Sequence, residues 1–163
     1  MKERTFTLTT ATGILTNEVN VGFEVPAGQS KFLTAGNDIV DLSEWDGSGS
    51  VNIGDAFSSD NDKVEVMAGA LNDNLKLTSI ENLEIVNAGV TAPVILNGAN
   101  FKGLEAVKLI GDATTLNFSD FTYGIKVDAT TNADSIIGSS KADTINGGTG
   151  NATLLLVTTA LTF

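Results

Sequence analysis

Three stretches in the middle of the chain decide the fold: Lys76-Leu-Thr-Ser-Ile-Glu-Asn-Leu-Glu-Ile85, Gly98-Ala-Asn-Phe-Lys-Gly-Leu-Glu-Ala-Val-Lys-Leu109 and Phe118-Ser-Asp-Phe-Thr-Tyr-Gly-Ile-Lys-Val127. Each has a bulky apolar anchor followed by an apolar, polar, apolar alternation that predicts a short β-strand. The anchors lie about 20 residues apart, a period typical of solenoids. The anchors are Ile80, Phe101 and Phe121; the expected inward pairs are Leu83/Ile85, Val107/Leu109 and Ile125/Val127, with Glu84, Lys108 and Lys126 outward.

A single strand of this kind cannot bury its apolar face, but identical strands stacked on one another share a continuous core. The sequence therefore predicts an all-β fold, a parallel β-helix or β-roll solenoid with short turns near the C-terminus. The alternative is an ordinary antiparallel sandwich whose strands resemble one another by chance.

The whole chain, 1–163, reads as one solenoid domain. Residues 1–70 are less regular, with strands expected at 6–9 and 19–25 and a Gly/Ser loop at 47–50 near Trp45. The rungs of about 20 residues occupy 71–128, nine-residue repeats occupy 129–155, and 153–163 is a C-terminal strand. No convincing amphipathic helix is present.

Composition excludes several classes of function. The 163 residues carry 20 acidic and 9 basic side chains, a formal charge of −11, so nucleic acid is a poor partner. This charge needs neutralisation, for which divalent cations are the obvious candidates, although acidity also serves solubility alone. The chain has no Cys and no His, which excludes nucleophile–histidine catalysis and thiolate or imidazole zinc sites. We expect no enzyme; a carboxylate-only glycosidase is the remaining catalytic alternative.

From Ala129 the period shortens to nine residues. The repeats begin at Ala129, Gly138 and Gly147, and they follow the pattern G-G-x-G-x-D-x-U-x with substitutions, where U is a large apolar residue. Gly-rich turns expose backbone carbonyls and each Asp adds a carboxylate, which is the ligand set that calcium prefers. At this point the sequence resembles the repeats-in-toxin (RTX) family of secreted bacterial proteins.

The resemblance implies a parallel β-roll in which calcium lies between turn n and turn n+2. It implies carboxylate ligands at Asp134 and Asp143, and carbonyl ligands near Gly138, Gly147 and Thr149. The chain departs from the pattern, because Ala152 stands where a third Asp belongs, Lys141 where Gly is usual, and Ala129 at a leading Gly. These substitutions weaken the expected sites, and the alternative is that the turns are metal-free.

Two earlier segments have a sequence pattern similar to the nonapeptides. Residues 34–41 match the second half of a nonapeptide and residues 59–64 match it more loosely, and either segment predicts a second calcium site, with Asp38 and Asp41 the stronger candidates. The candidate ligands are Asp38, Asp41, Asp60 and Asp62. An Asp in a turn also serves as a hydrogen-bonding cap, which is the alternative here.

The arrangement as a whole is similar to repetitive regions of bacterial surface-layer and adhesin-like proteins of the RTX class. That similarity implies a secreted, cell-surface protein exported through a type I channel, with residues 153–163 as a candidate secretion signal. It fits an N-terminus without an apolar signal segment and a chain without a membrane-length apolar run.

We expect the partner to be another copy of the chain, because a solenoid with uncapped ends presents strand edges for addition or end-to-end stacking. A cell-surface polysaccharide is a second candidate partner. No membrane insertion is expected. The alternative function is that of an adhesin or a glycan- or ice-binding module.

Overall fold

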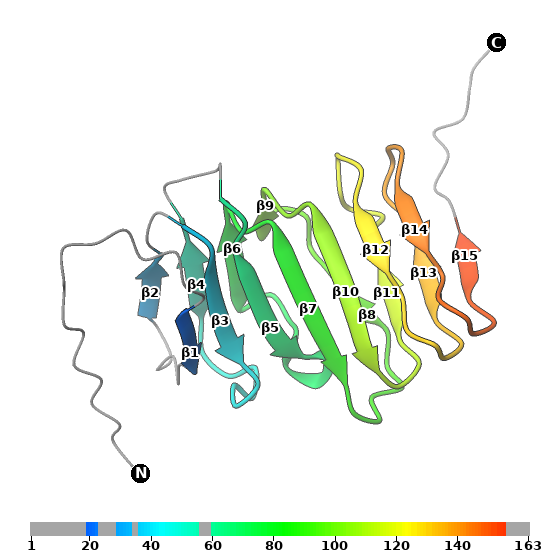
Figure 1. The fold of residues 1–163 in the computed structure, drawn as a ribbon, viewed down its shortest axis with the longest axis horizontal. Helices are drawn as coiled ribbons and strands as arrows, with labels where there is room; N and C mark the ends of the chain where they lie inside the picture. The colour runs from blue at the N-terminus through cyan, green and yellow to red at the C-terminus, as the bar shows by residue number, and fades with distance from the viewer. Residues whose placement is uncertain (1–18, 23–28, 34–35, 56–59, 156–163) are drawn as a thin grey trace.

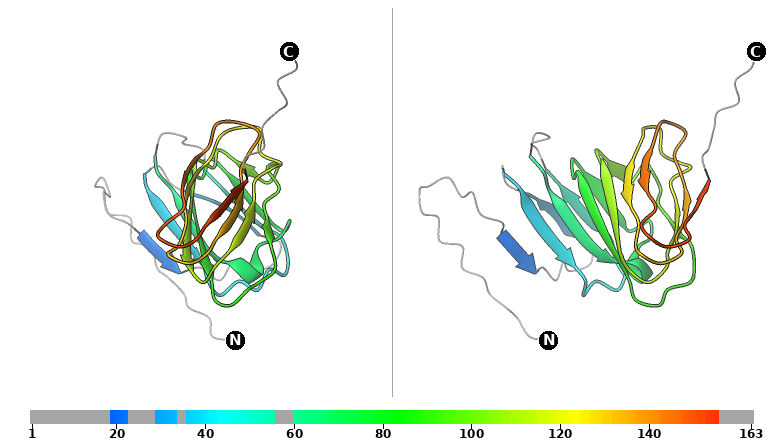
Figure 2. Two further views of the ribbon diagram at one scale, coloured as in Figure 1. Left: turned by 90° about the vertical axis from the view of Figure 1, so that its right-hand side faces the viewer. Right: turned by 45° about the vertical axis from the view of Figure 1, so that its right-hand side comes forward.

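In a computed structural model, described for residues 19–22, 29–33, 36–55 and 60–155, the chain is a β-solenoid built almost wholly of parallel strands (Figures 1 and 2). The prediction of fold class is therefore confirmed, and the antiparallel alternative is wrong, because every described pairing is parallel. The predicted strand at 6–9 and the tail 156–163 lie outside the described residues.

One sheet runs the length of the stack, and two shorter sheets form its opposite side. Sheet A has the order β1 (Val19–Gly22), β3 (Asp38–Leu42), β5 (Lys63–Met67), β7 (Asn82–Asn87), β10 (Ala106–Gly111), β12 (Lys126–Asp128) and β14 (Thr144–Asn146). Sheet B has the order β2 (Gln29–Phe32), β4 (Val51–Gly54), β6 (Leu75–Thr78) and β9 (Phe101–Lys102). Sheet C has the order β15 (Thr153–Leu155), β13 (Ser135–Ile137), β11 (Thr115–Asn117) and β8 (Val94–Ile95). A single 3₁₀ turn, η1 (Ala68–Ala70), is the only helical element among these described residues.

The chain alternates between sheet A and one of the other sheets. Before β7 it alternates with sheet B, and after β10 with sheet C, so β8 and β9 mark the change of partner sheet. The nonapeptide strands β13, β14 and β15 also alternate, C then A then C, so that β13 pairs with β15 two repeats later. The segment before residue 70, less regular in sequence, nevertheless places β3, β4 and β5 in the same sheets as the later rungs.

The core lies between sheet A and the two shorter sheets. The predicted inward residues Leu83, Ile85, Val107, Leu109, Ile125 and Val127 are all buried, and so are the anchors Ile80, Phe101 and Phe121. The rings of Phe101, Phe118 and Tyr123 surround Phe121, with centroid separations of 6.4, 5.4 and 5.3 Å. These rings fill the interior near the change from sheet B to sheet C.

Turns between rungs are held by backbone contacts that tolerate little substitution. Gly111 ends β10 with φ +90°, in register with Asn87, and a Cβ there would lie 2.2 Å from the Asn87 carbonyl oxygen. The buried Asn87 amide donates to the carbonyls of Val90 and Ala113 and so ties together two successive turns. Close stacking of neighbouring turns therefore dictates glycine at Gly111.

Candidate metal centre

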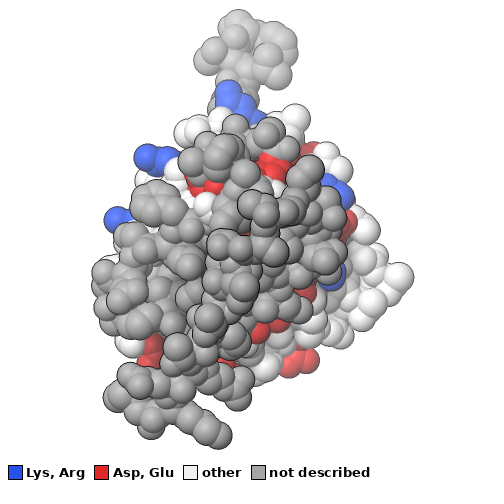
Figure 3. Space-filling model, turned by 60° about the vertical axis from the view of Figure 1, so that its left-hand side comes forward, with Lys and Arg blue, Asp and Glu red and all other residues white. Residues whose placement is uncertain are grey.

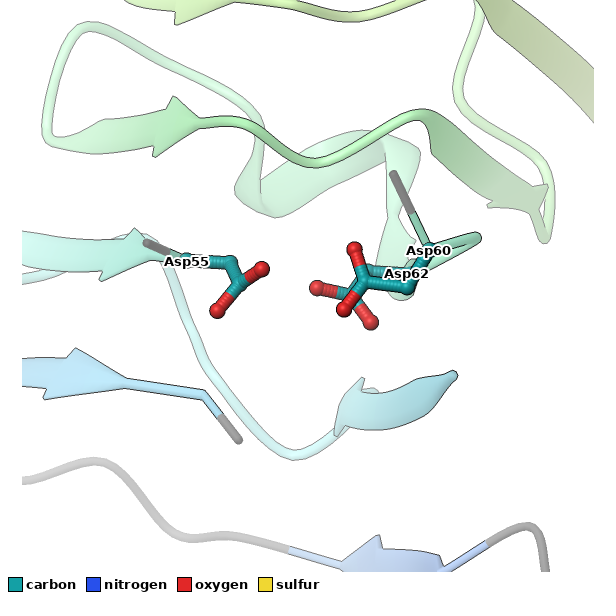
Figure 4. A group of neighbouring side chains, drawn as sticks. All are labelled: Asp55, Asp60 and Asp62. Atoms are coloured by element: carbon teal, nitrogen blue, oxygen red, sulfur yellow. The ribbon is translucent and has the colours of Figure 1, made fainter. Parts of the chain in front are cut away.

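Three aspartates converge near the N-terminal end of the solenoid. Asp55 directly follows β4 of sheet B, whereas Asp60 and Asp62 lie in the turn that leads into β5 of sheet A. One carboxylate oxygen from each lies within 4.8 Å of the others. Figure 4 shows the three carboxylates directed into a common space between the two chain segments. We call Asp55, Asp60 and Asp62 the aspartate cluster.

Asp55 and Asp62 are buried and Asp60 is half-buried, and hydrogen bonds satisfy only some of the carboxylate oxygens. Asp62 is 0% exposed and Asp55 is 7% exposed. The Gly36 amide donates to Asp60 Oδ2 at 3.0 Å, and the Asp38 amide donates to Asp62 Oδ1 at 2.8 Å. The other two oxygens, Asp60 Oδ1 and Asp62 Oδ2, are buried without a hydrogen-bond donor. A buried ionised carboxylate oxygen without a donor is costly, so these two oxygens call for a cation or a proton.

The raised pKa of Asp62 reflects this cost. Burial raises the pKa of the Asp62 carboxyl to about 7, and the hydrogen bond from the Asp38 amide opposes the rise. The neighbouring carboxylates of Asp60, Asp55 and Asp38 contribute to this rise. Like charges close together in a desolvated site disfavour simultaneous ionisation, and a bound cation reverses that balance.

The donor set limits what the cluster can hold. It offers only carboxylate oxygens, which suit hard cations and not the soft metals that select thiolate or imidazole. The aspartate cluster can therefore hold a metal ion, and it is the only such group of three or more acidic side chains in the described part of the chain.

Two of the three members, Asp60 and Asp62, were predicted from the sequence. Asp60 and Asp62 are brought together as one site, and Asp38 lies next to it through its backbone amide. Asp41 makes a turn contact instead, since its Oδ1 accepts the Ser43 amide at 2.8 Å. Asp55 was missed because it belongs to a different strand connection and has no nonapeptide around it. Its only local signal was an acidic residue directly after the strand 51–54.

The aspartates of the nonapeptides have another set of contacts. Asp134 is 1% exposed, its Oδ1 accepts the Thr114 amide at 2.8 Å, and its Oδ2 accepts the Thr130 amide and hydroxyl at 2.8 and 2.9 Å. Asp143 Oδ1 accepts the Ile125 amide at 2.9 Å, and its Oδ2 accepts the Ser139 amide at 2.8 Å. Each carboxylate thus ties its own turn to the preceding rung.

The remaining predicted ligands lie around these turns. The Gly138 amide donates to the Leu155 carbonyl at 2.9 Å, and a Cβ on Gly138 would lie 2.5 Å from Asp143 Oδ2. Gly147 is half-buried beside Ala152, and Thr149 is exposed. The structure does not gather Asp134 and Asp143 into an acidic group of the size of the aspartate cluster. Calcium at these positions stays a prediction.

The same cross-rung hydrogen bond recurs along the stack. In each case the carboxylate of one rung accepts an amide of the rung before it: Asp62 from Asp38, Glu81 from Asp62, Asp134 from Thr114, and Asp143 from Ile125. In the last nonapeptide Ala152 occupies the register position of Asp134, so this rung lacks the carboxylate. Only at Asp62 does this series leave the second oxygen buried without a donor, which distinguishes the aspartate cluster from a structural cap.

No protein-family model, no curated protein and no solved structure matches the chain. Among the described residues, no helix has both the length and the apolar character needed to cross a membrane.

Proposed function

We propose that the protein is an extracellular structural protein, stabilised by calcium, that assembles with copies of itself into a surface layer or filament. The single observation that carries the calcium part is the pair of buried oxygens, Asp60 Oδ1 and Asp62 Oδ2, that have no hydrogen-bond donor. A net charge of −11 and the resemblance of the turns to RTX repeats point the same way.

Calcium fits the aspartate cluster better than magnesium. Oxygens bound on opposite sides of one calcium ion lie about 4.6–5.2 Å apart, because each lies about 2.3–2.6 Å from the ion. The cluster oxygens all lie within 4.8 Å of one another, so a single calcium ion can contact all three. Magnesium demands a tighter octahedron and keeps most of its water, which a buried site with three carboxylates does not favour.

Calcium is expected to raise the thermal stability of the purified chain. At 10–100 times the dissociation constant, binding to the folded state alone adds roughly 1.4–2.7 kcal/mol to the free energy of unfolding. Scanning calorimetry in calcium and in excess chelator measures this difference. The variant Asp62→Asn is expected to lose most of the calcium response, because it removes one of the three ligand charges.

Two control arms locate the response. Exposed Asp120→Asn removes the same charge outside the cluster and is expected to respond to calcium as the wild type does. If Asp134→Asn loses the response and Asp62→Asn keeps it, the calcium site lies in the nonapeptides. No stabilisation of the wild type by calcium at any concentration would overturn the proposal.

In this proposal calcium also controls where the chain folds. Ion binding contributes directly to folding free energy, so a chain exported through a type I channel stays unfolded in low cytoplasmic calcium. Extracellular calcium modules bind with dissociation constants of roughly 10⁻⁴–10⁻³ M, which millimolar calcium outside the cell satisfies.

The assembly part rests on an exposed apolar side chain of β15, the last described strand of sheet C. Val94, Leu116, Ile136 and Leu154 form one inward row in register across sheet C. The first three are 5%, 0% and 1% exposed, whereas Leu154 is 47% exposed, because no further described strand covers β15. An exposed residue in an otherwise buried apolar row, on a strand with no described partner on its outer side, favours the addition of another chain.

Sedimentation velocity in calcium is expected to show concentration-dependent association. Leu154→Glu places a charge on the open core layer and is expected to shift the association to at least tenfold higher protein concentration, a cost of about 1.4 kcal/mol. Ile95→Glu is the matched control, since Ile95 is 66% exposed on β8, at the opposite edge of sheet C. A wild-type chain that stays monomeric throughout, or equal losses in both variants, would contradict assembly through this end.

A further inference from the structure

The three sheets differ in the charge that their strands carry. Strands β4, β6 and β9 of sheet B contain Lys76 and Lys102 and no acidic residue. The described strands of sheet C contain no charged residue. Sheet A carries an acidic row in register, Asp41 on β3, Glu65 on β5 and Glu84 on β7. Among the described strands, sheet B thus combines lysine with an absence of acid, although the whole chain has 20 acidic and 9 basic residues.

Several of these charges have no ion-pair partner within the molecule. Lys76 and Lys102 are exposed, and neither forms an ion pair with a described residue. The same holds for Asp41 and Glu65, which are half-buried on the outer face of sheet A. Unpaired lysines therefore lie on one sheet and unpaired carboxylates on another.

The lysines of sheet A do not neutralise this acidic row. Lys63 Nζ and Lys108 Nζ lie 3.7 and 3.5 Å from Glu84 Oε2, and Lys126 Nζ lies 3.5 Å from Asp128 Oδ2. Each lysine of this face thus has an acidic partner already. The acidic residues that remain without an ion pair are those of β3 and β5.

The outer faces of sheets A and B point in opposite directions, because the core lies between the two sheets. In Figure 3 basic side chains project at the left edge of the described surface, whereas acidic and basic side chains are mixed along the right edge. A neighbouring copy displaced sideways, without rotation, therefore sets its sheet B against sheet A of the first copy.

The spacing of the unpaired charges is the same on the two faces. Strand β6, with Lys76, is the neighbour of β9, with Lys102, and β3, with Asp41, is the neighbour of β5, with Glu65. Each pair is thus separated along the solenoid axis by one strand spacing, about 4.8 Å. A sideways copy shifted by one rung along the axis places both lysines opposite both carboxylates.

We infer that copies of the chain pack side by side, with Lys76 and Lys102 of one copy paired with Asp41 and Glu65 of the next. The contact joins two different faces and does not close, so it extends into a row of copies. Because a net charge of −11 makes copies repel one another elsewhere, the lysine face also fixes which sides meet.

This inference rests on the self-assembly proposed above and adds a lateral contact to it. Exposed ion pairs contribute little one at a time. A filament repeats the same pair of faces at every subunit, so two aligned filaments make many such contacts at once. The lateral contact therefore converts filaments that are already formed into a layer.

Electron microscopy of the full chain in millimolar calcium tests the contact. Two variants reverse the charge of one face each, Lys76→Glu/Lys102→Glu on sheet B and Asp41→Lys/Glu65→Lys on sheet A. Each variant is expected to lose the layers and to keep single filaments, because the contact through β15 is unchanged. An equal mixture of the two kinds of preformed filament is expected to regain the layers, since each reversed face then meets its complement.

Two controls accompany the variants. Lys141→Glu adds negative charge at an exposed turn outside both faces and is expected to keep the layers. Unfolding scans in calcium establish that each variant is folded. Glu65→Lys alone takes the place of Asp41→Lys/Glu65→Lys if the double variant does not fold.

The other outcomes overturn the inference. Wild-type filaments that stay single would leave the proposed assembly through β15 intact and assign the sheet B lysines to a different partner. Layers that persist in both variants would place the lateral contact on another face. Layers that are lost in the variants and do not return on mixing would show an effect of net charge. A wild type that forms neither filaments nor layers would remove the proposed assembly as well.

Discussion

In metal-free solution, the stability of the protein is expected to fall as the pH rises from about 4 to about 7. Burial and the neighbouring carboxylates hold the pKa of Asp62 at about 7, well above its ordinary range. Between these pH values the folded chain keeps a proton at this site that the unfolded chain has lost. Stability contributed by that proton is therefore full below the unfolded pKa and is lost as the pH approaches the folded one. The difference between the pKa values of Asp62 in the folded and unfolded chain corresponds to at most about 4 kcal/mol of unfolding free energy.

Asp62→Asn isolates the pH-dependent contribution of Asp62 to stability. Asparagine has nearly the same shape as aspartate, and its side-chain oxygen can still accept the hydrogen bond from the Asp38 amide. At pH 8 without metal, we expect the variant to exceed the wild type in free energy of unfolding by about 2–4 kcal/mol. Below pH 4 the difference disappears, and saturating calcium reverses it. Urea unfolding of both chains at a series of pH values, with and without chelator, measures all three regimes.

Two further variants separate the contribution of Asp62 ionisation from the effects of net charge and of lost hydrogen bonds. Asp120→Asn corrects for the general benefit of removing one negative charge from a chain of −11. Asp134→Asn is expected to destabilise, because its amide would face the Thr130 donors that now meet a carboxylate. A wild type whose stability relative to Asp62→Asn does not change with pH would show that ionisation of Asp62 does not destabilise the aspartate cluster.

Truncation of Phe121 to alanine is expected to lower the free energy of unfolding by about 3–5 kcal/mol. The side chain is 1% exposed and contacts three other aromatic rings, so its removal leaves a cavity that the stacked sheets cannot close by a small shift. These rings also lie where the coil changes its partner sheet. Chemical denaturation followed by circular dichroism measures the loss.

Phe121→Leu is the accompanying conservative variant and is expected to lose less than half as much. It fills part of the cavity but gives up the ring contacts. If Phe121→Ala costs less than about 1 kcal/mol, the aromatic cluster does not hold the two halves of the solenoid together.

The solenoid itself could be predicted from the sequence because its cause is local and repeated. Inward residues such as Leu83, Val107 and Val127 recur with strand alternation, and burial of that face requires a stack. The alternation of the nonapeptide strands between two sheets follows from a nine-residue period, which allows one strand and one turn per repeat. The rungs are not uniform in length, since β3 and β5 are offset by 24 residues, β7 and β10 also by 24, and β10 and β12 by 20.

The aspartate cluster differs from the solenoid fold in this respect, since only two of its three members could be predicted from the sequence. A turn pattern was enough to nominate Asp60 and Asp62, because the spacing of acidic residues within one turn is a local property. Tertiary structure alone placed Asp55 against them, since it comes from the end of a strand in another sheet. The fold likewise decided that Asp134 and Asp143 are surrounded by amide and hydroxyl donors while Asp62 keeps an oxygen without one. Sequence thus determined which residues carry charge and which face inward, whereas the stacking of distant coils decided which carboxylates meet, because that depends on strand register between rungs.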